Sequence, residues 1–374
     1  MQLIYFFQSF VFFASGLFVK RNFDVVFYYP HHFNRGKKNE NQFFKKLLQT
    51  CDKYNISYVV FEEPDYSSVA KRNKNAIGFD FMYVLIILLR KLFNTEMCIH
   101  TKDQKIGRFL SKILFRSFTF KHFITLSQSM LSVFRGLNPN ANLFDLQHGI
   151  IHNNKENYLM HGLASENLKA NNTSLLLQGK SYKELLLKNE IADYFQTHTH
   201  VIGSHVSLAN FKHQQFNNNV LITLQFTHDH SKEENKALKI ELTSFIRSFN
   251  TDINFYLKHH PRFNNEVDLS SLLALDNVHL ATEDIHVCFD LCSLHATSYS
   301  TCTFEAALLG IPTILINPLS AHNYFVTDFS YPINHTILDF SEEEVYRSSS
   351  KEIRKWATAY HEPFNVTEFL KIIQ

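Results

Sequence analysis

The sequence predicts an α/β protein made of two doubly wound domains, each a parallel sheet between layers of helices. Its 374 residues are enough for two domains of ordinary size. Short β-rich runs alternate with stretches of helical apolar spacing, and this alternation begins a second time after residue 205. Polar motifs follow several expected strands, at the carboxyl ends where open parallel sheets bind ligands. Residues 1–205 and 206–350 are the expected domains, with a cleft between them.

The composition is that of a globular protein, with 45% hydrophobic and 19% charged residues. The net charge of +2 predicts no bulk attraction to nucleic acid. Five cysteines without a CxxC pair argue against a disulfide framework and against a structural zinc site. We therefore expect a protein of a reducing compartment, cytoplasmic and peripheral on the inner face of the membrane.

In the first domain, β-rich runs at 24–30 and 57–63 enclose a stretch of helical spacing, which predicts a βαβ unit and hence a parallel sheet. An apolar helix is expected at 79–93 and a basic amphipathic helix at 102–121. The remaining expected strands of this domain are 142–146, 174–179 and 199–204, with a helix around 183–189.

The second domain repeats the pattern. Ser231 is placed to cap a helix at 231–250, and Ser341 with Glu344 three residues later predicts the start of a charged C-terminal helix. The expected strands are 219–225, 253–261, 294–300 and 312–317, with a further helix at 303–310.

Two segments raise the question of a membrane. The apolar run at 3–21 is interrupted by Gln8 and Ser9 and is short for a span of about 20 residues. We expect a buried or interfacial segment, with a membrane anchor as the alternative. The basic helix at 102–121 is either a solvated helix face or a patch that rests on anionic lipid.

The stretch NLFDLQHGIIHNN, residues 142–154, is a buried strand that ends in polar groups. Gln147, His148 and Gly149 follow the apolar run directly, and His152 lies just beyond. Asp145 precedes them within the strand. Such an edge is either a polar turn or the acid–base side of a catalytic site.

The stretch HATSYSTCTFEAALLGIPTILIN, residues 295–317, takes a strand directly into a helix. Ser298, Ser300 and Thr301 bring hydroxyl groups to the start of the helix, where free N–H groups favour phosphate. Glu305 lies one turn further, where a carboxylate can accept hydrogen bonds from ribose hydroxyls. The alternative is a capped core helix without a ligand.

The stretch YLKHHPRF, residues 256–263, places three cations at a strand end. Alternation puts Lys258, His260 and Arg262 on one side, and Pro261 fixes the turn. This group suits a diphosphate or a departing phosphate, to which His260 can donate a proton. A solvent-facing basic turn is the alternative.

The loop TLQFTHDHS, residues 223–231, adds Gln225 and Thr227 after another strand. His228 and His230 flank Asp229 at a spacing that could hold a metal. With 21 histidines in the chain and no further ligand placed by sequence, a polar loop is the preferred interpretation. No metal site is expected.

In chain order, these motifs resemble those of bacterial glycosyltransferases of the GT-B fold. LQHG, LLLQGKSY and HVIGS carry the resemblance in the first half, and LITLQFT, KHHPR and SYSTCTFEAALLGIP in the second. They are most similar to capsule and surface-polysaccharide enzymes with a Lys-x-His-Pro motif, such as sialyl-, polysialyl- and β-Kdo transferases, which use CMP-sugars. The resemblance implies that helices within 351–374 return to the first domain.

The resemblance implies an inverting, metal-independent transfer of a sugar, Kdo or sialic acid, to a surface-glycan or lipid-linked glycan acceptor, without a cofactor. His148 is the expected base, with Asp145 as a competitor and a substrate-positioning histidine as the rival role. Gln147, Gly149 and His152 would lie on the acceptor side, where Gly149 permits a close backbone turn. The expected nucleotide-binding residues are Gln225, Thr227, Lys258, His260, Pro261, Arg262, Ser298, Ser300, Thr301 and Glu305.

Three alternatives remain open. CDP-glycerol and CDP-ribitol phosphotransferases also resemble this layout, but the tryptophan usual before their His-Gly is replaced by Gln147. A UDP-sugar transferase would keep the same motifs. A catalytically silent binding subunit would keep the fold and lose the polar residues.

Overall fold

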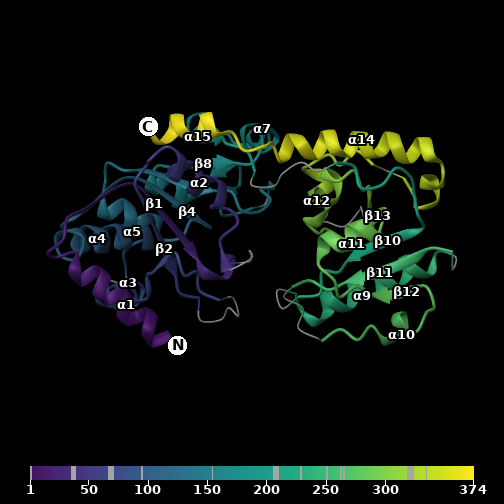
Figure 1. Ribbon diagram of the computed structural model, residues 1–374, viewed down its shortest axis with the longest axis horizontal. Coiled ribbons are helices and arrows are strands. Elements are labelled where there is room, and N and C mark those ends of the chain that lie inside the picture. Colours follow the sequence, from purple (N-terminus) through teal and green to yellow (C-terminus); the bar gives the residue numbers. More distant parts are fainter. Residues whose placement is uncertain are drawn as a thin grey trace. The chain divides into compact units, whose positions relative to one another are not determined.

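The computed structural model describes residues 2–34, 39–65, 71–93, 96–153, 155–204, 210–227, 230–249, 252–261, 263, 266–317, 324–333 and 335–374. The chain divides into two compact units, Met1–Val206 with His361–Gln374 and Ser207–Tyr360 (Figure 1). Of the C-terminal segment, residues 361–374 belong to the first unit, and the preceding helix belongs to the second.

The first unit contains a seven-stranded sheet of order β3-β2-β1-β4-β5-β8-β9 in which every neighbouring pair is parallel. Residues 25–30 of β1 are buried, as expected for a strand covered on both faces. The strands are β1 Arg21–Pro30, β2 Tyr58–Glu63, β3 Ile77–Gly78, β4 Phe118–Leu126, β5 Asn142–Leu146, β8 Thr173–Leu177 and β9 Thr199–Val201.

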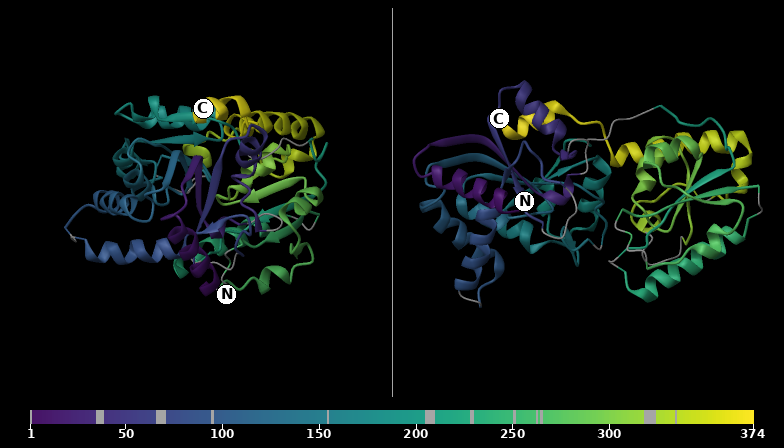
Figure 2. Two further views of the ribbon diagram at one scale, coloured as in Figure 1. Left: turned by 60° about the vertical axis from the view of Figure 1, so that its left-hand side comes forward. Right: turned by 60° about the horizontal axis from the view of Figure 1, so that its bottom comes forward.

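Helices cover both faces of this sheet (Figure 2). A short antiparallel hairpin, β6 Leu159–Met160 and β7 Leu163–Ala164, lies between β5 and β8 in the chain. The helices are α1 Gln2–Ser15, η1 His31–Phe33, α2 Lys45–Lys53, α3 Asp80–Leu92, α4 Ile99–Lys112, α5 Leu131–Leu137, α6 Glu166–Asn171, α7 Lys180–Asn189, α8 Tyr194–Thr197 and α15 Val366–Ile373.

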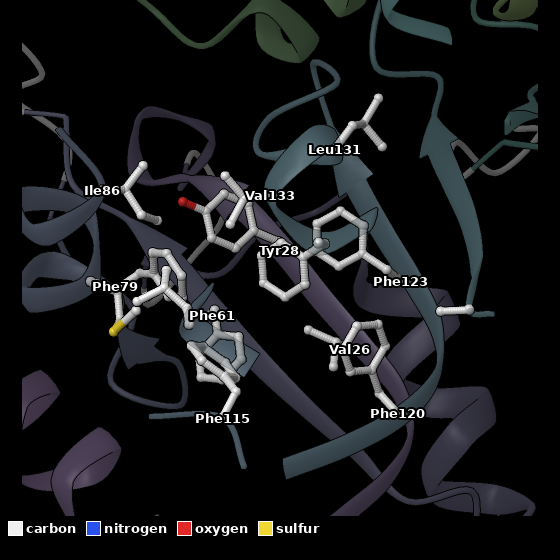
Figure 3. Close-up of a cluster of buried hydrophobic side chains, with 14 of the residues drawn as sticks. Val26, Tyr28, Phe61, Phe79, Ile86, Phe115, Phe120, Phe123, Leu131 and Val133 are labelled. Carbon is white, nitrogen blue, oxygen red and sulfur yellow. The ribbon is translucent and has the colours of Figure 1, made fainter. Parts of the chain in front are cut away.

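Alternation along β1 divides the core into two layers. Val26 and Tyr28 point into a cluster that contains Phe123 (Figure 3). The Phe123 ring stacks on the ring of Phe134, with 3.9 Å between the centroids. The neighbouring β1 residues point to the other face, where α2 and α15 pack. The C-terminal helix α15 thus completes the core of the first unit through Phe369 and Ile373.

The basic helix is shorter than predicted. α4 ends at Lys112, and Phe118 and Lys121 belong to β4. The sequence FTFKHFITL alternates aromatic and β-branched residues, and it pairs with β1 over most of its length, so tertiary pairing overrides the helical spacing that continues into it.

The second unit contains a five-stranded sheet of order β12-β11-β10-β13-β14, again parallel throughout. Ser231 forms the predicted cap, a full capping box with Glu234. The elements are β10 Asn219–Thr223, α9 Lys232–Arg247, β11 Asn254–Lys258, α10 Ser270–Leu273, β12 Val278–Leu280, α11 Ile285–Leu291, β13 Leu294–Thr297, α12 Cys302–Leu308, β14 Thr313–Leu315, α13 Tyr324–Thr327, η3 Leu338–Ser341 and α14 Glu343–Tyr360.

Two predictions for this unit are wrong. Ser341 ends the short helix η3 and donates its hydroxyl to the Leu338 carbonyl at 2.7 Å, so it does not cap α14. β11 ends at Lys258, before His260, because the chain turns there, with Phe263 N donating to the His260 carbonyl at 2.9 Å. None of the described helices has both the length and the apolar character needed to cross a bilayer.

Candidate functional site

In the first unit, the carboxyl ends of adjacent strands bring His148 and Ser127 together. β4 and β5 are neighbours, Ser127 follows β4, and His148 follows β5. The Nε2 atom of His148 lies 3.1 Å from the Ser127 hydroxyl. The half-buried imidazole also packs edge-on against Phe33 and Phe43, at 5.0 and 6.3 Å between ring centroids. These contacts fix the ring at the sheet edge.

The loop that carries Ser127 has an unusual backbone. Ser127, Gln128 and Met130 have φ values of 57°, 55° and 56°, in the left-handed region that costs residues other than glycine free energy. Gln128 holds the loop: its side chain donates to the Asn157 carbonyl at 2.5 Å and accepts from Asn167 at 3.0 Å. The surrounding structure thus stabilises a strained turn that presents Ser127 to His148.

Asp145 stabilises the loop that carries Ser127 through a hydrogen bond to its backbone. Its carboxylate is fully buried and accepts from Gln128 N at 2.8 Å and from the Tyr158 hydroxyl at 3.0 Å. Burial raises the pKa of Asp145 to about 7, against the effect of these two hydrogen bonds. A group without solvent access cannot contact an acceptor, so the expectation of Asp145 as a competing base is corrected to a positioning role.

Gln147 and Gly149 also differ from expectation. Gln147 is 1% exposed, its amide accepts from Gln178 N and donates to the Gly149 carbonyl, both at 2.9 Å, and it joins the ends of β5 and β8. Its amide is therefore used within the fold and does not orient a substrate. Gly149 is exposed, its φ is not left-handed, and a Cβ there would have no described atom within 4 Å. The prediction of a close backbone turn at Gly149 is therefore wrong. His152, three residues further along the chain, is half-buried.

Two histidines at this edge were missed. His31 and His32 follow β1, which lies next to β4 in the sheet. His32 Nδ1 lies 2.7 Å from the Asp65 carboxylate, and its ring packs against Phe33 at 4.3 Å, the same phenylalanine that contacts His148. His31 accepts from Asp65 N at 2.7 Å, and burial, followed by the nearby Arg72 charge, lowers its pKa. The sequence signal was Pro-His-His directly after a β-rich run.

A buried ion cluster forms the base of this edge. Glu62, at the end of β2, contacts Arg72, which pairs with Asp80 at 2.8 Å. Glu62 also accepts from Asn34 at 2.7 Å and from the Tyr29 hydroxyl at 3.2 Å. Because each buried charge has a partner and further hydrogen bonds, the cluster is a structural support for the edge.

In the second unit, hydroxyl groups connect the ends of β10 and β13. Thr297 donates to the Thr223 carbonyl at 2.9 Å and accepts from Ser300 N at 3.2 Å. Ser300 is buried and accepts from Cys302 N at 3.3 Å. These bonds match the alternative of a capped core helix for Ser300, whereas Ser298 is half-buried and Thr301 exposed.

Glu305 and the loop after β10 line the same edge. Burial raises the pKa of Glu305, and the charges nearest to it are those of His286 and Asp284 at the start of α11. Gln225 is half-buried and donates to the Leu224 carbonyl at 3.1 Å, while Thr227 is buried. His228 and Asp229 lie outside the described residues.

His230 has a protein partner at this edge. Its Nε2 lies 2.7 Å from the Tyr299 hydroxyl, and Tyr324 donates to the Tyr299 carbonyl at 2.8 Å. These contacts join the loop after β10 to the segment after β13. Within the part of the chain that the structure describes, no group of three or more His, Cys, Asp or Glu side chains is placed to hold a metal ion.

The Lys-His-His-Pro segment is only partly as predicted. Because β11 ends at Lys258, alternation does not determine on which side His260 lies. Lys258 Nζ donates to the Glu283 carbonyl, and His259 stacks on Phe263 at 3.9 Å, where burial and then Lys258 lower its pKa. His260 is half-buried and Pro261 exposed. Arg262 lies outside the described residues.

Comparisons with known proteins bear on the fold. No family model matches the chain, and no curated protein matches it. The structure is similar to the UDP-GlcNAc 2-epimerase of Methanocaldococcus jannaschii, with 12% identity over 93% of this chain and 98% of that chain and a TM-score of 0.51. It is also similar to a variant of the wall teichoic acid polymerase TagF, with 12% identity over 94% and 87% of the two chains and a TM-score of 0.51.

A third similar structure is a putative UDP-N-acetylglucosamine 2-epimerase from Listeria monocytogenes, with 12% identity over 93% and 94% of the two chains and a TM-score of 0.50. At such low identity these likenesses establish the fold and leave the reaction open. The chain has the GT-B fold of two Rossmann-like domains, as its sequence predicted.

Proposed function

We propose that the protein is an inverting, metal-independent glycosyltransferase that moves a sugar from a nucleotide-sugar donor to a glycan acceptor. The observation that carries this proposal is the His148–Ser127 pair, with 3.1 Å between Nε2 and the hydroxyl oxygen, beside the open backbone of Gly149. Inverting transfer needs a base at the acceptor hydroxyl, and imidazole titrates in the required range.

In the proposed reaction, His148 takes the proton of the acceptor hydroxyl. The acceptor oxygen forms a bond to the anomeric carbon, and the nucleotide leaves with the electrons of the broken carbon–oxygen bond. The Ser127 contact and the two phenylalanine rings hold the imidazole in place, which reduces the reorganisation needed at the moment of transfer. His32, which is paired with Asp65 and packs against Phe33, is a further candidate for acceptor binding.

The second unit is the proposed donor site. Ser298 and Thr301 offer hydroxyls at the carboxyl edge, and Lys258, His260 and Arg262 supply positive charge for the phosphate. Glu305 is the proposed ribose ligand, with Gln225 and Thr227 beside the nucleotide. The resemblance of KHHPR and LQHG to CMP-sugar enzymes makes Kdo or sialic acid the proposed sugar, and a surface or lipid-linked glycan the proposed acceptor.

The first test compares melting temperatures of the full-length protein with CMP, CDP, UDP and GDP at matched concentrations. A ligand at 100 times its Kd stabilises the folded state by about 2.7 kcal/mol, so the preferred nucleotide gives the largest shift. We expect CMP to give it. If none of the four nucleotides shifts the transition, the donor site in the second unit is wrong.

The second test separates the base from the donor site. His148→Gln should lower kcat about 100- to 10,000-fold, the usual contribution of a general base, and leave the CMP-induced shift unchanged. His198→Gln is the matched control, because His198 stacks on Tyr194 away from the carboxyl edge. Undiminished transfer by His148→Gln would overturn its role.

Product analysis separates the alternatives. A polyol-phosphate transferase, suggested by the His-Gly and His-Pro pattern, would respond to CDP and form a new phosphodiester bond. A UDP-sugar transferase would respond to UDP and form a glycosidic bond. A silent binding subunit would bind a nucleotide without turnover of any donor.

A further inference from the structure

Helix α1 has an apolar face that the protein leaves uncovered. One face packs on the first unit: Phe13 is buried among Phe61, Phe79 and Phe115, and Ser9 accepts from Phe81 N at 3.2 Å. The opposite face and the following turn are apolar as well, and their exposed side chains are Leu3 (72%), Ile4 (59%), Phe7 (60%), Phe10 (44%), Val11 (63%), Leu17 (47%), Phe18 (89%) and Val19 (50%).

Helix α1 is exposed along one side and, as described, is shorter than a bilayer core is thick. A core helix would be covered on all sides, and the 14 residues of α1 reach only about 21 Å, short of the roughly 30 Å of a hydrocarbon core. No residue of α1 is charged. An open groove of about 500 Å³ runs along the exposed face, lined by Phe7, Gln8, Val11, Phe12, Ser15 and Arg21. The arrangement is that of a helix lying in an interface, with the protein body in place of its polar face.

A row of cations lies on α4 and in the turn that follows it. Lys105, Arg108 and Lys112 are exposed along α4, and exposed Arg116 follows in the turn before β4. None of the four forms an ion pair with a described residue. Asp103, the sole carboxylate of α4, is buried and paired with Arg90 at 2.6 Å. The row therefore has an uncompensated positive charge.

The apolar face and the cation row meet at the end of α1. A Cβ on Gly16 would lie 3.5 Å from the Leu114 carbonyl oxygen, and Phe13 packs against Phe115 at 5.2 Å. Arg21 N donates to the Ser117 carbonyl at 2.7 Å. The exposed turn at 17–20 is thus next to the segment that carries Ile113 and Arg116, both exposed. Figure 1 shows α1 with α3 and α4 at one side of the first unit.

We propose that this surface, the exposed face of α1 together with the cation row on α4, binds the surface of an anionic lipid bilayer. The apolar side chains enter the boundary between headgroups and acyl chains, and the four cations contact lipid phosphates. The burial of apolar surface and the electrostatic attraction to anionic lipid both add to the strength of such binding. The charge complementarity favours an anionic membrane over an apolar protein partner. The proposal does not depend on the proposed catalytic function.

The test is co-sedimentation of the full-length protein with vesicles of phosphatidylcholine, with and without phosphatidylglycerol. We expect binding to the anionic vesicles that weakens with added salt, and much weaker binding to the neutral ones. Absence of binding to both vesicle types, or equal binding to both, would overturn the proposal.

Two pairs of variants test these two contributions to binding. Phe7→Gln with Val11→Gln should weaken binding to anionic vesicles at least about tenfold, because two apolar side chains no longer leave water. The matched control is Ile191→Gln with Leu338→Gln, at apolar residues that are 78% and 64% exposed elsewhere. A loss of the same size in the control would contradict the role of α1. All four substitutions lie at exposed positions, and unchanged melting temperatures verify folding.

Lys112→Gln with Arg116→Gln should weaken binding about fivefold for each removed charge, and only to anionic vesicles. Lys351→Gln with Lys355→Gln removes two exposed cations from α14 and is the control. The alternative is that a second copy of the chain covers the exposed face of α1, and light scattering over a range of concentrations tests for such a dimer. A dimer that Phe7→Gln with Val11→Gln dissociates would show that the face is a protein interface and overturn the proposal.

Discussion

Each unit contains a completely buried ionisable side chain in a central strand, Asp145 in the first unit and His295 in the second, and burial shifts their pKa values in opposite directions. The pKa of Asp145 in β5 is raised to about 7, and the pKa of His295 in β13 is lowered to about 3. The cause is the same, because burial disfavours whichever form is charged. The ring nitrogens of His295 lie 2.8 and 2.9 Å from the hydroxyls of Thr223 and Thr313, with no ion pair to a described residue. At these sites the first unit therefore tolerates low pH, and the second unit tolerates high pH.

The carboxyl edges of the two sheets also differ in what holds them. In the first unit the support is ionic, from Glu62, Arg72 and Asp80. In the second unit it consists of hydroxyl and backbone groups, such as the bonds of Thr297 and Ser300. Removal of one partner from a buried ion cluster costs far more than loss of a neutral hydrogen bond, so the first edge should be the more sensitive one.

The largest expected effect is at the ionic edge. Arg72→Met leaves Glu62 and Asp80 buried without their cation, and it should lower the free energy of unfolding by about 3–5 kcal/mol. The matched variant in the second unit, Thr297→Val, should cost about 1 kcal/mol, the value of a neutral hydrogen bond. Urea unfolding followed by circular dichroism measures both. An equal or smaller cost for Arg72→Met would contradict the difference between the two edges.

The next effect is a pH dependence from Asp145. Its folded-state pKa of about 7 lies above the ordinary 3.8, so the stability it contributes is present below pH 3.8 and is lost as pH rises to 7. Within this window the free energy of unfolding should fall by about 1.4 kcal/mol per pH unit from this group. Asp145→Asn, which keeps an acceptor for Gln128 N, should remove that slope. Hydrogen exchange of the β5 amides at several pH values is the measurement.

His295 should show the reverse dependence in the second unit. Its folded-state pKa of about 3 lies below the ordinary 6.5, so its contribution is present above pH 6.5 and is lost as pH falls towards 3. Within this window the free energy of unfolding should fall by roughly 1.4 kcal/mol for each pH unit that the pH is lowered. Other groups titrate in the lower part of the window, so only the upper part of this slope can be assigned to His295. His295→Gln should flatten the dependence.

The single tryptophan makes this last comparison specific to one unit. Trp356 lies in α14 and stacks on Phe304 at 4.7 Å, so its fluorescence reports unfolding of the second unit. His295→Gln should change the tryptophan-monitored midpoint at acidic pH, and Asp145→Asn should not. If both variants shift that midpoint equally, the two units unfold together and the comparison between them fails.

The smallest effect is expected at Gly149. Gly149→Ala should change the free energy of unfolding by no more than about 0.5 kcal/mol, as is usual at open surface positions. Gly107→Ala is the contrast, because its Cβ would collide with the backbone of Val133 and Gly136 where α4 crosses α5. Reduced transfer by a stable Gly149→Ala protein would indicate that the acceptor lies over this residue. Substantial destabilisation would show that the space above Gly149 is filled in the folded protein.

Local patterns predicted most of the architecture. The βαβ alternation and the helix cap at Ser231 follow from neighbouring residues, and the structure confirms them. The same patterns were wrong at two places. Lys121 lies in a strand and not in a helix because β4 pairs with β1. The strand β11 ends before His260. Helical and strand spacing differ little over such short stretches, so the strands available for pairing decide which of the two a stretch forms.

The placement of Asp145, Gln147 and His148 at the end of one strand follows from the local sequence. Their different roles depend on contacts from elsewhere in the chain, because Tyr158, Gln128 and the end of β8 cover Asp145 and Gln147 and leave His148 half-exposed. The same holds for Ser127 and Phe33, which are distant in sequence and contact His148 because β1, β4 and β5 are neighbours in the sheet. Periodicity gives the direction of a side chain, but what lies above it depends on contacts made far along the chain.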